Sequence, residues 1–185
     1  MNDIVKIGGK LAVICAVAAV VLGLANAVTE PKIALMKKIK LEKSLEQVSQ
    51  GMKIGKYKAV SDSPVVKGYY PLINADNKKS GYICKLIGNG YGGDLDIIAG
   101  ISAKGKILAV ILLDDNETPG LGKQAEHASY MKKYIGTGEN KPVPVRKSQL
   151  SQKDADAVTG ASITFMGIGK ALAAGSSYVK KLGGE

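Results

Sequence analysis

An apolar stretch near the amino terminus sets the first constraint on how this chain can fold. Residues Leu11–Val28 read LAVICAVAAVVLGLANAV, with Asn26 as the only strongly polar side chain. A run of this length approaches the ~20 residues that a helix needs to cross the hydrocarbon core of a bilayer. The sequence therefore predicts a transmembrane anchor over residues 11–30, preceded by a cytoplasmic amino terminus, residues 1–10.

A cleavable signal peptide has similar features, and this alternative stays open. Lys6 and Lys10 precede the apolar run, and the small residues Ala25-Asn26-Ala27 lie where a signal peptidase would cut. Both interpretations place the remaining chain outside the cytoplasm if the amino terminus stays inside. Lysines also follow the run, so charge alone leaves the orientation undecided.

The pattern of apolar residues beyond the anchor predicts one α+β domain. A helical connector is expected over residues 31–55, with a helix that begins at Pro31 and is stopped by Gly51 and Gly55. The extracytoplasmic domain would then be residues 56–185. Its expected strands are Lys56–Val60, Val65–Ile73, Gly81–Ile87, Leu95–Ser102 and Lys106–Leu113.

Two helices and a hairpin complete the predicted domain. The turn Lys104-Gly105 separates two runs rich in β-branched residues, a pattern typical of a β-hairpin. A short helix is expected within Gly122–Tyr134, and a long one over Ser162–Leu182. Antiparallel strands with flanking helices define the α+β class.

Composition argues against several kinds of site. One histidine and two cysteines without a CxxC pair leave no basis for a zinc or iron–sulfur site, so we expect no metal. Aromatic residues are sparse and basic residues are not densely clustered, which argues against nucleic acid as a partner. The net charge of +10 favours anionic partners such as lipid headgroups or phosphates, or else a solvated lysine-rich surface.

The segment that opens the last predicted helix is a candidate phosphate site. It reads Asp156-Ala157-Val158-Thr159-Gly160-Ala161-Ser162-Ile163-Thr164. Small residues allow close approach by a bulky group, and a helix N-terminus offers free N–H groups and a favourable dipole to an anion. Ser162 or Thr159 would cap the helix, and Thr164 would lie in its first turn. Taken alone, the segment is more typical of an ordinary capped helix with a Gly-Ala turn.

Two glycine-containing loops are the other candidates for a binding site. Glu117-Thr118-Pro119-Gly120-Leu121-Gly122 follows a predicted strand, and its glycines would let the backbone approach a flat ligand. Gly88-Asn89-Gly90-Tyr91-Gly92-Gly93 mimics a dinucleotide-binding loop, but no helix follows it, so a Rossmann interpretation fails. Each loop is also compatible with a purely structural turn.

Taken in order, these segments resemble one family, the FMN-binding domain of the Rnf complex G subunit and of the C subunit of the sodium-pumping NADH:quinone reductase. The resemblance is carried by Gly90–Gly93, Lys104-Gly105, Glu117–Gly122 and Thr159–Thr164, and it extends over essentially the whole chain. The compact length and the intact Glu117–Gly122 segment are more similar to the Rnf protein.

The resemblance implies a cofactor and the residues that hold it. A flavin transferase would move FMN from FAD, with Mg²⁺, onto the hydroxyl of Thr164, giving a covalent phosphoester. Asp156 matches the acidic position of the transferase motif, and position 162 is Ser where the family more often has Thr, so Ser162 is a second possible acceptor. The implied cofactor-binding residues are Thr164, Ser162, Ala161, Gly160, Thr159, Asp156, Glu117, Thr118 and Leu121, with no separate catalytic residue.

The implied function is that of an electron carrier in a membrane complex. The chain would be a single-pass subunit of the cell (inner) membrane, with its domain on the extracytoplasmic side. It would serve an ion-translocating ferredoxin:NAD oxidoreductase, a translocase, with other membrane subunits as partners and little activity alone. Two alternatives are an anchored binding or structural module without a working flavin, and a flavinylated carrier for another reductase.

Overall fold

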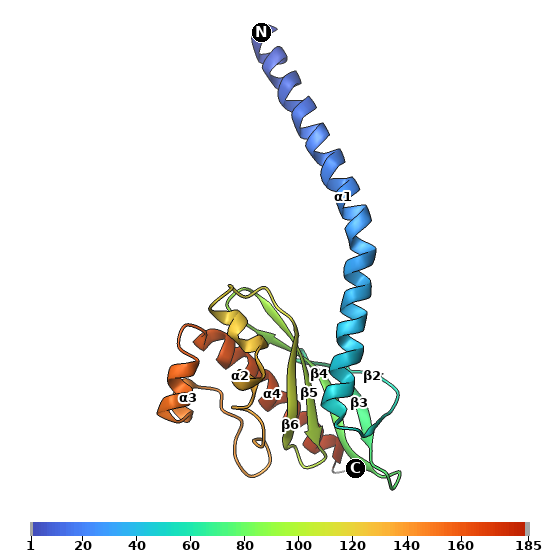
Figure 1. Ribbon diagram of the computed structural model, residues 1–185, viewed down its shortest axis with the longest axis vertical. Coiled ribbons are helices and arrows are strands. Elements are labelled where there is room, and N and C mark those ends of the chain that lie inside the picture. The colour runs from blue at the N-terminus through green and yellow to red at the C-terminus, as the bar shows by residue number, and fades with distance from the viewer. Residues whose placement is uncertain (1, 184–185) are drawn as a thin grey trace. The chain divides into compact units, whose positions relative to one another are not determined.

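The computed structural model describes the fold of residues 2–183, which divide into two units between Leu41 and Glu42. A single helix, α1 (Asn2–Ser49), supplies the first unit and continues into the second. All strands and the remaining described helices belong to the second unit, whose elements can be followed by colour in Figure 1. The expected α+β class is confirmed.

Within the described residues, α1 is the one helix long and apolar enough to cross a membrane. Its apolar side chains, Leu11 and Val17 among them, are exposed. The expectation that Pro31 begins a second helix is wrong, because α1 runs through Pro31 to Ser49. Proline removes only one N–H from the helical ladder, and the neighbouring turns persist. The division into an anchor, residues 11–30, and a connector, residues 31–55, stays a prediction.

The sheet of the second unit is wholly antiparallel. Its strands are β1 (Lys53–Ile54), β2 (Lys58–Ala59), β3 (Val66–Ile73), β4 (Lys79–Asn89), β5 (Asp94–Ser102) and β6 (Ile107–Asp114). The order is β1-β3-β4-β5-β6, with β2 also paired to β3. The hairpin predicted at Lys104-Gly105 joins β5 to β6, and Gly105 supplies the positive φ of 86° that its turn requires.

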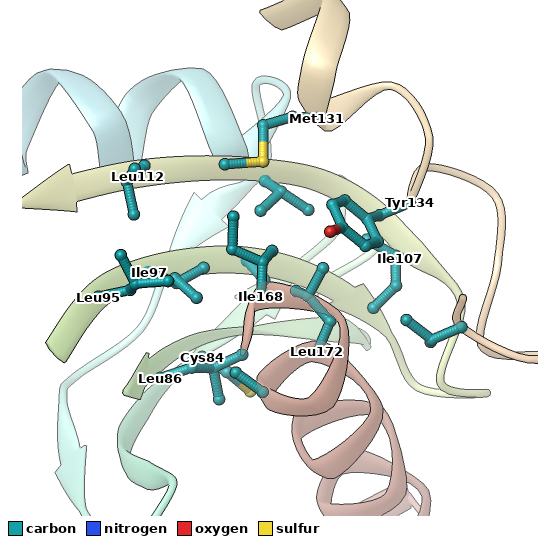
Figure 2. Close-up of a cluster of buried hydrophobic side chains, with 14 of the residues drawn as sticks. Cys84, Leu86, Leu95, Ile97, Ile107, Leu112, Met131, Tyr134, Ile168 and Leu172 are labelled. Atoms are coloured by element: carbon teal, nitrogen blue, oxygen red, sulfur yellow. The ribbon is translucent and has the colours of Figure 1, made fainter. Parts of the chain in front are cut away.

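Alternation along β5 shows where the core lies. Leu95, Ile97 and Ala99 belong to the main hydrophobic cluster together with Ile168 and Leu172 of α4 (Ser162–Gly183), which packs on that face of the sheet (Figure 2). Successive strand residues point to opposite faces. The long helix predicted over 162–182 is confirmed, and the structure shows that it packs against β4 and β5.

The opposite face of β5 is covered by the end of α1. Ile98 is fully buried, and a side chain at Gly100 would contact Val48, which is itself fully buried. The last turns of α1, residues 42–49, thus belong to the same compact unit as the sheet. Gln50 and Gly51, with φ angles of 50° and 82°, end the helix in left-handed backbone.

The connection from β6 to α4 is made of short helical turns. The helix predicted within 122–134 is two pieces, η1 (Gly122–Glu126) and α2 (Ala128–Met131), separated by extended backbone at His127. A further turn, η2 (Lys147–Gln149), precedes α3 (Gln152–Ala157). The sequence had indicated neither of these two elements. Ser151 caps α3 by accepting the N–H of Asp154.

Two glycines bring the start of α4 into backbone contact with its neighbours. A Cβ at Gly167 would overlap the carbonyl oxygen of Asn89, the last residue of β4, and one at Gly169 would overlap that of Pro144. Any larger residue would force the helix away from the sheet. The first turns of α4 are therefore fixed beside the end of β4, where the candidate site lies.

Candidate functional site

A pocket of ≈ 390 Å³ lies at the amino-terminal end of α4. Three separate segments meet there: the glycine loop after β4, the loop after β6, and the turn that opens α4. The lining residues are Tyr91, Glu117, Thr118, Leu121, Gly122, Gly160, Ala161, Ser162, Ile163 and Thr164.

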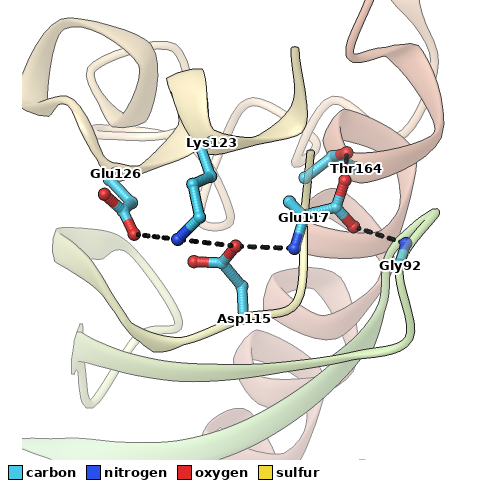
Figure 3. Close-up of polar contacts among 6 residues, drawn as sticks. All are labelled: Gly92, Asp115, Glu117, Lys123, Glu126 and Thr164. Carbon is cyan, nitrogen blue, oxygen red and sulfur yellow. Dashed lines mark hydrogen bonds and ion pairs between the residues drawn. The ribbon is translucent and has the colours of Figure 1, made fainter. Parts of the chain in front are cut away.

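The centre of this site is a contact between Glu117 and Thr164, shown in Figure 3. The Thr164 hydroxyl donates to Glu117 Oε2 over 2.8 Å, and the Gly92 N–H donates to Oε1 over 3.0 Å. Glu117 and Thr164 are only 4% and 1% exposed. The backbone N–H of Glu117 in turn donates to Oδ1 of Asp115 over 2.9 Å. Each oxygen of this buried carboxyl group thus accepts one hydrogen bond from a neutral donor, and the two donors come from distant segments.

Glycines leave the room that this carboxylate occupies. A Cβ at Gly90 would overlap Oε1 of Glu117, and one at Gly122 would overlap Oε2. Neither glycine has a positive φ, so the requirement is space rather than backbone conformation. The glycine loop of residues 88–93 therefore forms one wall of the site.

We predict that Gly122→Ala destabilises the unflavinylated chain by about 1–3 kcal/mol, because the added methyl must displace the buried Glu117 carboxylate. Urea unfolding followed by circular dichroism would measure the change. Ser177→Ala, on the exposed side of α4, is the control and should stay within about 0.5 kcal/mol of wild type. A Gly122→Ala chain as stable as wild type would mean that Glu117 moves aside freely.

A second charged group supports the loop from outside the pocket. Lys123 Nζ lies 3.2 Å from Glu126 Oε1 and 3.8 Å from Asp115 Oδ1. Burial raises the pKa of Asp115, while the Glu117 N–H bond and Lys123 oppose that rise. The hydrogen bond to Glu126 is the main cause that raises the pKa of Lys123, followed by the charge of Asp115. Lys123 thus offsets negative charge beneath Glu117.

Two buried tyrosines hold the first turn of α4. The Tyr130 hydroxyl donates to the carbonyl of Ala161 over 3.1 Å, and that of Tyr134 donates to the carbonyl of Phe165 over 2.7 Å. Burial raises the pKa of both phenols, and the nearby Glu117 charge raises that of Tyr130 further. Both hydroxyls therefore stay protonated donors at neutral pH.

The N-terminus of α4 lacks the side-chain cap that we expected. The first helical bond runs from the N–H of Phe165 to the carbonyl of Ala161, which makes Ala161 the N-cap residue. Its methyl group offers no acceptor. The Thr159 hydroxyl instead donates to the Ala155 carbonyl and accepts from Lys147 Nζ. N–H groups at the start of a helix have no carbonyl one turn earlier, so this end is suited to an anion.

The structure brings most of the predicted site residues together. Seven of the nine line the pocket: Glu117, Thr118, Leu121, Gly160, Ala161, Ser162 and Thr164. Asp156 and Thr159 are exposed and lie outside the lining, and Asp156 accepts a hydrogen bond from Gln152.

Three lining residues were absent from the predicted set: Tyr91, Gly122 and Ile163. Tyr91 is 75% exposed, Ile163 52% and Leu121 48%. Exposed side chains of this size around one pocket suit a flat, apolar ligand. The only sequence signal for these three residues is their position inside the glycine loop, the Glu117–Gly122 segment and the Thr159–Thr164 segment.

Cys84, one of the two cysteines, belongs to the core of the sheet. Cys84 is fully buried in β4, and burial raises the pKa of its thiol to about 12, so it is not a reactive thiolate at neutral pH. In the part of the chain that the structure describes, no group of three or more His, Cys, Asp or Glu side chains is arranged to hold a metal ion.

Comparison with known proteins shows what this domain is similar to. Residues 90–176 match the FMN-binding domain family. The match begins at the glycine loop and includes every residue that lines the pocket.

The chain as a whole is homologous to the G subunits of ion-translocating oxidoreductase complexes. It is 25% identical to the G subunit of the proton-translocating ferredoxin:NAD(+) oxidoreductase complex of Clostridium ljungdahlii, over 91% of this chain and 88% of that protein. It is 25% identical to the G subunit of an ion-translocating oxidoreductase complex of Methanosarcina acetivorans, over 96% and 95%. The G subunit of the Na(+)-translocating ferredoxin:NAD(+) oxidoreductase complex of Acetobacterium woodii is 32% identical over 41% of this chain and 37% of that protein.

The residues of the pocket fit an FMN group. A phosphate suits the uncapped helix end beside Thr164, and the flat ring suits the exposed surfaces of Leu121, Tyr91 and Ile163. The pocket is therefore compatible with both the phosphate and the flat ring of FMN.

Proposed function

We propose that this chain is an electron-transfer subunit of a membrane-bound, ion-translocating ferredoxin:NAD oxidoreductase, and that it carries one FMN joined through its phosphate to Oγ1 of Thr164. The observation that carries the proposal is the position of that hydroxyl. It lies in the pocket lining, in the first turn of α4, where the helix end favours a phosphate. Ser162, the other candidate acceptor, also lines the pocket, but it is the Thr164 hydroxyl that donates to Glu117.

When bound, FMN supplies the redox chemistry, and the protein sets its position, exposure and potential. The start of α4 binds the phosphate, and Thr118 and Leu121 contact the flavin from the opposite loop. A phosphate tether leaves the ring unmodified and prevents loss of the cofactor from an extracytoplasmic domain. The role requires no acid–base pair acting on a substrate, so the isolated chain should have little turnover.

The remaining parts of the proposal concern maturation and location. A flavin transferase attaches the group, using FAD, and Asp156 and Thr159 contribute to the surface that the transferase reads, since both are exposed beside the acceptor turn. The apolar part of α1 anchors the chain in the membrane, with the domain on the extracytoplasmic side and other subunits of the complex around it.

In-gel fluorescence tests the cofactor. The full chain, co-expressed with a flavin transferase, is denatured in SDS and examined under ultraviolet light, and its tryptic peptides are analysed by mass spectrometry. A fluorescent band, with the mass of FMN on the peptide that contains residue 164, is expected. Expression without the transferase is the control and should give a dark band. A dark band in both samples would favour a binding module without a flavin.

A further inference from the structure

The Glu117–Thr164 contact has a consequence for how FMN is attached. Both carboxylate oxygens of Glu117 accept hydrogen bonds, Oε1 from the Gly92 N–H and Oε2 from the Thr164 hydroxyl. Thr164 is only 1% exposed. Within the unflavinylated chain, a base is therefore already in contact with the hydroxyl that must lose its proton.

We propose that Glu117 takes the proton of the Thr164 hydroxyl during flavin transfer and retains it beside the new phosphodiester. This inference rests on the proposed attachment at Thr164. The bond between Oγ1 and the phosphorus of the FMN half of FAD forms, and the diphosphate bond breaks. AMP leaves with the bridging oxygen, and the hydroxyl proton moves to Oε2 of Glu117. No group is oxidised or reduced.

Charge balance supports retention of the proton. Before transfer, the pair consists of a carboxylate and a neutral hydroxyl. After transfer, the ester oxygen has no hydrogen to donate, and the phosphodiester carries one negative charge beside Glu117. An ionised Glu117 and the phosphodiester would both be negative, and two negative charges so close together repel strongly in a buried site. A Glu117 that has accepted the proton is neutral and donates a hydrogen bond to the phosphate, so the total charge of the pair stays at one negative charge.

The surroundings of Glu117 hold the carboxyl group where this transfer needs it. Gly90 and Gly122 fit tightly around the carboxyl group, and the Gly92 N–H fixes Oε1. The nearby cation Lys123 pairs with Asp115 and Glu126. Tyr130, the neighbouring phenol, donates to the Ala161 carbonyl. Proton uptake by Glu117 therefore removes the repulsion between its carboxylate and the phosphodiester without moving the groups that surround it.

Flavin transfer kinetics test the first half of the proposal. Purified full-length chain is mixed with FAD, Mg²⁺ and a flavin transferase, and in-gel fluorescence is followed with time. Glu117→Gln preserves size and hydrogen bonding to Gly92 but provides no base, so its attachment rate should fall by about 100-fold or more. Glu139→Gln, outside the pocket, is the matched control and should react at the wild-type rate. Near-ultraviolet circular dichroism confirms that each chain is folded.

Infrared spectroscopy of the wild-type chain tests the second half. The difference spectrum of flavinylated minus unflavinylated protein should show a new carbonyl band of a protonated carboxylic acid. The band should shift when glutamate is labelled with ¹³C.

The outcomes separate this inference from the proposed function. If the wild-type chain acquires no FMN at Thr164, both this inference and the proposed function are wrong. A fluorescent wild type with an equally fast Glu117→Gln chain overturns only the role of Glu117 as proton acceptor. If Glu117→Gln does not fold, the wild-type infrared spectrum still decides, because the absence of a protonated carboxyl band would show that the proton is not retained.

Discussion

The Thr164→Val chain is expected to carry no covalent flavin when it is produced together with a flavin transferase. Valine matches threonine in shape but has no oxygen with which a phosphoester can form. In-gel fluorescence should fall to the background of the chain made without the transferase. In a purified complex, the same substitution should reduce ferredoxin:NAD activity to a small fraction of wild type, because electrons would lose a carrier.

One hydroxyl substitution close to Thr164 is the control for this experiment. Ser162→Ala removes the hydroxyl of the other candidate acceptor, and this chain should still form the ester at Thr164. Loss of the Thr164–Glu117 hydrogen bond leaves a buried acceptor unsatisfied, at a cost of about 1–3 kcal/mol. Folding of Thr164→Val should therefore be verified by circular dichroism. A bright Thr164→Val band and a dark Ser162→Ala band would move the attachment to Ser162.

Local patterns predicted the elements of the fold better than their boundaries. Apolar runs rich in β-branched residues, with turn residues between them, located strands β3 to β6 and the β5–β6 hairpin. The Ala- and Gly-rich composition of residues 162–182 located α4. Pro31 misled the prediction, since one missing hydrogen bond does not end a long helix when the residues on both sides favour it.

The site was predicted in outline because its residues lie in short motifs, but its central contact was not. Glu117 and Thr164 are separated by 47 positions, and nothing local indicates that one accepts a hydrogen bond from the other. The burial of Glu117 depends on space left by Gly90 and Gly122, which only the folded chain reveals. The capping roles proposed for Ser162 and Thr159 followed propensity, whereas packing made Ala161 the N-cap residue.

Phe165 contributes both to the packing of the domain and to the geometry of the site. Its side chain is fully buried and stacks on Tyr134 at a centroid distance of 5.0 Å. It meets the ring of Tyr130 edge-on at 6.2 Å. The backbone carbonyl of Phe165 accepts the Tyr134 hydroxyl, and Thr164 is its neighbour in the chain. The ring therefore anchors the first turn of α4 from the core side.

Phe165→Ala is expected to destabilise the domain by about 3–5 kcal/mol, the usual cost of removing a buried phenyl ring. The measurement is urea unfolding of the unflavinylated full-length chain in detergent. Ile163→Ala, two residues earlier and 52% exposed, should change stability by less than about 0.5 kcal/mol. If both variants unfold at the wild-type urea concentration, the aromatic cluster does not hold α4. A different result is expected: only Phe165→Ala is destabilised, and this chain also acquires FMN more slowly. That result would mean that the Phe165 ring both stabilises the core and holds the acceptor hydroxyl in position. The reason is that Thr164 can contact Glu117 only while the first turn of α4 stays in place.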